Sequence, residues 1–120
     1  MGSENVGEQI DGAIYTDGLA CLVETKDQTD STGFEAIAKL TLQLQRRPAS
    51  TLGLLFSTSE FTTPLLEAVR FHPVRNVLLW KRTDIDLAME HGMRVALWLK
   101  WTRAVEQAQL AHWLRKDDFR

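Results

Sequence analysis

The hydrophobic and polar positions of this chain follow two different periods. They alternate residue by residue over residues 7–16 and 19–26, on either side of Asp17-Gly18. This pattern predicts a β-hairpin with a two-residue type I′ turn. Two short apolar runs, at residues 51–57 and 76–80, predict buried central strands.

The segments between and after these strands have helical spacing. Thr32 followed by Glu35 predicts a capping box that opens a helix over residues 33–46, which Pro48 ends. Thr62 or Thr63 is expected to cap a second helix that ends before Pro73. A short helix over 84–90, a break at Gly92 and a long helix over 93–114 complete the chain. The expected order is ββαβαβα, an α/β domain with a mixed sheet.

Composition limits the number of domains and the class of protein. A chain of 120 residues with 44% hydrophobic and 25% charged residues is typical of one small globular domain. No apolar run approaches the roughly 18 residues of a membrane span, and no secretory signal is visible. The single cysteine, Cys21, excludes an internal disulfide and is expected inside a strand, so we expect a cytoplasmic protein. Met1-Gly2-Ser3 have the composition of an expression remnant and are not expected to belong to the fold.

The net charge of −2 hides an asymmetry along the chain. Residues 1–38 hold eight acidic side chains and one basic one, whereas residues 39–120 hold thirteen basic and eight acidic ones. An acidic pocket beside a basic surface suits a metal-dependent enzyme that acts on a polyanion. A solvated surface can also vary this much, so charge alone does not decide between the two.

The two-residue turn determines which residues of the hairpin face each other. Paired positions must add up to 35, so Asp11 is expected opposite Glu24, with Lys26 on the same face. Two carboxylates roughly 5 Å apart at Cβ repel each other, and a divalent cation between them removes the conflict. The opposite face is apolar and should pack on a helix; it consists of Ile10, Ile14, Leu19, Cys21 and Val23.

A metal with an ammonium group beside it suits phosphodiester hydrolysis. The cation polarises the phosphate and lowers the pKa of bound water, and Lys26 orients that water or offsets developing charge. The alternative is that Asp11 and Glu24 are solvated carboxylates that Lys26 neutralises. The Asp11–Glu24 pairing favours the metal site.

The same residues resemble a known signature. Ile10-Asp11-Gly12, followed by Leu22-Val23-Glu24-Thr25-Lys26, is similar to the motif of the PD-(D/E)XK nuclease superfamily. Segments 44–48, 53–57 and 61–62 resemble its Mrr-like restriction endonuclease branch, so the similarity spans residues 7–80. The resemblance implies a restriction-endonuclease-like core and an endonuclease that cuts DNA with Mg²⁺ or Mn²⁺. It also implies that Asp11, Glu24 and the backbone carbonyl of Thr25 bind the metal and that Lys26 is the catalytic lysine.

The chain departs from the family pattern at its start. Ile10 stands where the family usually has proline, and only six residues precede the first expected strand, so the first family helix is missing. Its loss should leave one sheet face partly uncovered. We therefore expect a dimer or higher oligomer.

Further residues are candidates for contact with DNA. Lys39 and Gln43 lie one turn apart on the predicted helix 33–46, with Arg46 and Arg47 beyond, and basic side chains of this kind bind phosphates. Equally, Glu35 and Lys39 fit an ordinary i,i+4 surface pair, and arginines are favoured at a helix C-terminus.

Three functions remain open. The first is a metal-dependent DNA nuclease. The second is a nuclease-derived DNA-binding or assembly module that has lost catalysis. The third is a fragment of a larger nuclease.

Overall fold

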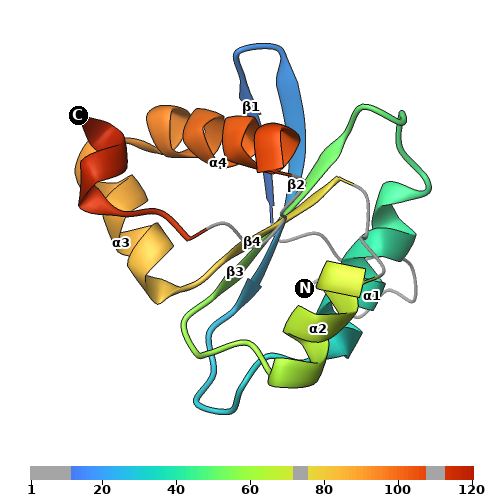
Figure 1. The fold of residues 1–120 in the computed structure, drawn as a ribbon. Helices are drawn as coiled ribbons and strands as arrows, with labels where there is room; N and C mark the ends of the chain where they lie inside the picture. Colours follow the sequence, from blue (N-terminus) through green and yellow to red (C-terminus); the bar gives the residue numbers. More distant parts are fainter. Residues whose placement is uncertain (1–11, 72–75, 108–112) are drawn as a thin grey trace.

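The computed structural model describes residues 12–71, 76–107 and 113–120, which form a four-stranded mixed sheet with helices on both faces (Figure 1). The strands are β1 (Gly12–Thr16), β2 (Leu19–Lys26), β3 (Leu52–Ser57) and β4 (Val77–Trp80). The helices are α1 (Phe34–Leu44), α2 (Thr63–Phe71), α3 (Arg82–His91), α4 (Met93–Gln107) and the 3₁₀ helix η2 (Lys116–Phe119). The predicted α/β class is confirmed.

The hairpin has the predicted register. Thr16 pairs with Leu19 and Gly12 with Val23, so the paired positions add up to 35. Asp17 and Gly18 have φ angles of 51° and 81°, the two positive values that a type I′ turn requires. The predicted first part of the strand, including Asp11, lies outside the described residues.

The sheet has the order β1-β2-β3-β4, with β1 antiparallel to β2 and the other pairs parallel. Alternate residues of β2, β3 and β4 enter two separate cores. Leu22, Leu55 and Leu79 pack with α1 and α2 on one face. The other face packs with α3 and α4, through a set that includes Cys21, Leu54, Leu78 and Trp80. The predicted apolar hairpin face is expected to pack on a helix. Its described members Ile14, Leu19 and Val23 pack against the cluster that contains Cys21 and residues of α3 and α4, which confirms that prediction.

Helices lie on both faces of the described sheet (Figure 1), but the edge strand β1 is covered on one face only. Ala13 and Tyr15 lie on the face that α1 and α2 cover elsewhere and are exposed, Tyr15 to 78%. The dimer remains a prediction. The helices of the described segments include none that is both long enough and apolar enough to cross a membrane.

Two helix predictions are wrong in detail. Thr32 does not cap α1; the N-cap is Gly33, without a side-chain cap, and the Thr32 hydroxyl lies 2.7 Å from Ser57 Oγ instead. The last helix does not continue through residues 113 and 114. The Leu114 N–H donates to the Asp84 carboxylate, and Trp113 stacks on Phe61 with 6.0 Å between ring centroids. Tertiary contacts replace helical hydrogen bonds in both places.

Gly53 is where α1 lies closest to the sheet. A Cβ at this position would lie 2.9 Å from both Leu40 Cδ2 and Leu44 Cδ1. We expect Gly53→Ala to lower the free energy of unfolding by about 1–3 kcal/mol, because the added methyl overpacks this contact. Gly12→Ala is the matched control, since no atom lies within 4 Å of its added Cβ, and it should change stability by about 0.5 kcal/mol or less. Equal effects in urea denaturation would contradict this account.

Candidate functional site

The predicted Glu24–Lys26 motif lies at the carboxyl end of β2, next to parallel β3 and beneath α1. Glu24 lies between Val23 and Thr25 in the strand. Its side chain is buried, and only 2% of the residue is exposed. Its Oε2 atom lies 3.5 Å from Lys26 Nζ and 3.5 Å from Lys39 Nζ of α1. One buried carboxylate therefore holds two ammonium groups that come from different elements.

The two oxygens of Glu24 have different surroundings. Oε2 faces both lysines, whereas Oε1 is buried without a hydrogen-bond partner in the described part of the chain. A buried carboxylate oxygen without a donor or cation costs free energy, and native structures contain few of them. Glu24 Oε1 is thus suited to bind a further ligand with positive charge.

Hydrogen bonds connect the carboxyl ends of β2 and β3 with the loop that precedes α1. Thr32 Oγ1 lies 2.7 Å from Ser57 Oγ, and Ser57 Oγ donates to the Ser59 carbonyl at 2.9 Å. The Thr58 N–H donates to the Lys26 carbonyl at 3.1 Å, which ties the ends of β2 and β3 together. These bonds hold the backbone that carries Lys26 and the start of α1 in a defined position.

A pocket of about 260 Å³ opens beside the two lysines. Its lining comes from the end of β2, the following loop and the first turns of α1, and includes Lys26, Gln28, Ser31, Gly33, Glu35 and Lys39. The side chains of Lys26 and Lys39 are 31% and 41% exposed. Both ammonium groups can therefore meet a ligand from solvent while they contact Glu24.

The other predicted site residues are distributed as follows. Asp11 lies outside the described residues, and Thr25 follows Glu24 on β2. Gln43 is 4% exposed on the inner side of α1, a position that does not favour contact with nucleic acid. Arg46 and Arg47 follow the end of α1, about two turns beyond Lys39. The structure thus brings together Glu24, Lys26 and Lys39.

A larger pocket, of about 490 Å³, lies where the hairpin turn meets α4. Arg94 Nε donates to both carboxylate oxygens of Asp17, at 3.1 and 3.0 Å, and this bond lowers the pKa of Asp17. Val95 and Trp98 supply apolar lining. Its two charges neutralise each other, so this pocket has less capacity for chemistry than the one beside Glu24.

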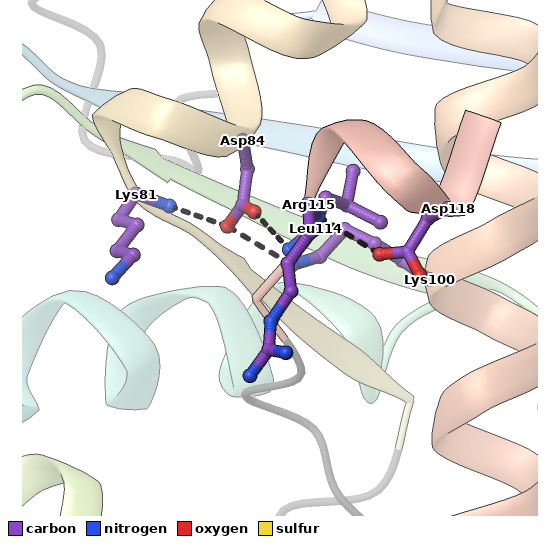
Figure 2. Close-up of polar contacts among 6 residues, drawn as sticks. All are labelled: Lys81, Asp84, Lys100, Leu114, Arg115 and Asp118. Atoms are coloured by element: carbon purple, nitrogen blue, oxygen red, sulfur yellow. Dashed lines mark hydrogen bonds and ion pairs between the residues drawn. The ribbon is translucent and has the colours of Figure 1, made fainter. Parts of the chain in front are cut away.

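A second charged cluster was not predicted from the sequence. Asp84 of α3 and Lys100 of α4 are fully buried, with 3.2 Å between Asp84 Oδ2 and Lys100 Nζ (Figure 2). Asp84 also accepts the N–H groups of Lys81 at 3.1 Å and Leu114 at 2.6 Å. The cluster joins three segments of the fold, and both charged side chains are shielded from solvent by the described residues, an arrangement that suits a contribution to stability. The one sequence signal is a lysine within the apolar segment 97–101 of α4.

The pKa of Lys100 gives this cluster a measurable pH dependence. Burial lowers that pKa from its ordinary 10.5 to about 8, against the opposing effect of Asp84. Between these pH values the unfolded chain binds more protons than the folded one, so the free energy of unfolding should rise with pH. Urea denaturation below pH 8 and near pH 10.5 should show this rise in the parent chain and less of it in Lys100→Met. An equal rise of the free energy of unfolding with pH in the two proteins would mean that Lys100 is not its source.

Comparison of this chain with protein-family models, curated proteins and solved structures gives no match. The geometry around Glu24 is therefore the basis for inferring a function.

Proposed function

We propose that this chain is a metal-dependent phosphodiester hydrolase that acts on DNA, with a restriction-endonuclease-like core. The observation that supports it is the buried Glu24 carboxylate, which has an unpartnered Oε1 and lies two residues before a solvent-accessible lysine. A purely structural ion pair would not need a buried oxygen without a donor. A carboxylate that binds a metal, by contrast, needs an oxygen that is available to the cation.

The residues around Glu24 fit a hard divalent cation in part. Glu24 Oε1 is an available carboxylate oxygen, the ligand type that Mg²⁺ and Mn²⁺ prefer. Within the described segments, no group of three or more His, Cys, Asp or Glu side chains could hold a metal. Asp11 and the Thr25 carbonyl would complete the set, as the family resemblance implies. The bound cation would supply a water of lowered pKa and a positive charge next to the phosphate.

The lysines supply the rest of the chemistry. Lys26 is positioned by Glu24 and reaches solvent, so its ammonium group can donate to a phosphate oxygen or to the attacking water. Negative charge grows on the phosphate oxygens as the bond to the leaving oxygen breaks, and a fixed ammonium group stabilises it. Lys39 adds a second positive charge from α1, also 3.5 Å from Glu24 Oε2.

One observation favours a different function. Two ammonium groups share one carboxylate, so this trio carries a net positive charge without any metal. Such a site can bind the phosphates of DNA without cutting them. A catalytically inactive DNA-binding or assembly module is therefore the second candidate.

Nicking of supercoiled plasmid separates the two functions. The nuclease proposal expects relaxed or linear plasmid in the presence of Mg²⁺ or Mn²⁺, and none in EDTA. A chain that retains plasmid in a gel-shift assay but leaves it intact with both metals would be a binding module. Purified Lys26→Ala protein, treated in parallel, excludes a contaminating nuclease.

A further inference from the structure

We infer that the pocket between Lys26 and Lys39 is a binding site for a single phosphate group. The inference deepens the proposed function, because it assigns the place of a DNA phosphate, but it does not require that the chain cut DNA. The ligand chemistry is a phosphate dianion or a phosphodiester.

The two lysines are the main reason. Their ammonium groups converge on one oxygen, Glu24 Oε2, at 3.5 Å each, and both line the same pocket. A single carboxylate cannot neutralise both of them. Because each lysine keeps about a third or more of its side chain exposed, a second anion can reach both from the solvent side.

The first turn of α1 borders the same pocket. Gly33 and Ala36 line it, and the N-cap Gly33 has no side chain that could satisfy the first N–H groups of this 11-residue helix. Free N–H groups at a helix N-terminus attract anions through hydrogen bonds and the helix dipole. Helix and lysines thus present positive charge to the same volume of about 260 Å³.

One side chain opposes the anion. Glu35 lines the pocket, is exposed, and lies in the first turn of α1. Its charge should weaken phosphate binding, so the site predicts opposite effects for two neutralising substitutions. Lys39→Met should weaken binding, and Glu35→Gln should strengthen it. A residue that only stabilises the fold would not produce this pair of signs.

The test is a titration of the full ¹⁵N-labelled chain in EDTA, at constant ionic strength, followed by NMR. One arm uses inorganic phosphate and the other a thymidine dinucleotide with a single phosphodiester. We expect saturable shifts of the Gly33, Phe34 and Glu35 amide signals. Lys39→Met should weaken the affinity about tenfold or more, since it removes a charge-assisted hydrogen bond. Lys39→Arg should keep most of the affinity, and Glu35→Gln should raise it.

Lys116→Met is the matched control, because Lys116 is exposed on η2 and does not line the pocket. Phosphate binding that is equal in the parent chain and a folded Lys39→Met variant would overturn the inference. So would amide shifts that chloride reproduces. Binding of inorganic phosphate without the dinucleotide would support the phosphate site and contradict its use for DNA. Phosphate binding without any plasmid cleavage would support the inference while the proposed nuclease activity fails.

Discussion

Asp84→Ala is expected to lower the free energy of unfolding by about 3–5 kcal/mol, which is a large part of the stability of a domain this size. The substitution removes the acceptor of three donors at once: the N–H groups of Lys81 and Leu114, and Lys100 Nζ. It also leaves the fully buried Lys100 without the Asp84 carboxylate. The contacts of Lys100 Nζ with the Trp80 and Trp113 rings, at 4.9 and 5.3 Å from their centroids, remain.

Two further variants identify the source of this loss. Asp86→Ala removes an exposed aspartate two residues away, whose partner Arg82 is 3.8 Å distant, and should change stability by about 1 kcal/mol or less. In Asp84→Ala/Lys100→Met the buried charge is gone, so the double variant should be more stable than Asp84→Ala alone. Urea denaturation measures all of these. A double variant at least as unstable as the sum of the single ones would mean that the charge pair is not the cause.

Glu24→Gln is expected to reduce plasmid cleavage by at least about a hundredfold, because it removes the charge and the oxygen proposed to bind the metal. The effect on folding should be much smaller. The two lysines that lose the carboxylate are partly exposed, so the free energy of unfolding in EDTA should fall by about 1 kcal/mol or less. Lys26→Ala should also abolish cleavage, but it should leave metal binding largely intact, because a lysine is not a metal ligand.

The melting temperature with and without Mg²⁺ separates these roles. Mg²⁺ should raise it for the parent chain and for Lys26→Ala, and not for Glu24→Gln. Glu67→Gln, which makes the same change at an exposed position of α2, should resemble the parent in every assay. If Glu24→Gln is stabilised by Mg²⁺ as strongly as the parent is, the metal does not bind at Glu24.

Local sequence was sufficient for the hairpin and for most element positions. Asp17 and Gly18 adopt positive φ, and a two-residue loop then leaves one register for the strands on either side. The pairing of Thr16 with Leu19, and of every described residue of β1, follows from that turn. The apolar runs of β3 and β4 similarly identify strands that are buried on both faces.

The candidate site was predictable only in part. The alternation of β2 places Glu24 and Lys26 on one face, so their proximity follows from the strand itself. Lys39 was visible as a basic residue on a helix, with contact to DNA or to Glu35 as the expected roles. Its contact with Glu24, 15 residues away, depends on which face of the sheet α1 covers. Periodicity identifies the apolar side of a helix, but not the strand against which that side packs.

The sequence by itself determined the hairpin register, the α/β class and the Glu24-x-Lys26 motif, because each depends on residues a few positions apart. Tertiary structure decided three other features: that Lys39 shares Glu24 with Lys26, that the Thr32 hydroxyl bonds to Ser57 instead of capping α1, and that Asp84 joins Lys100 to Leu114. These contacts link residues 15 to 30 positions apart, and no local pattern specifies them. They form because buried polar groups must find partners among whichever segments the packed sheet and helices bring close.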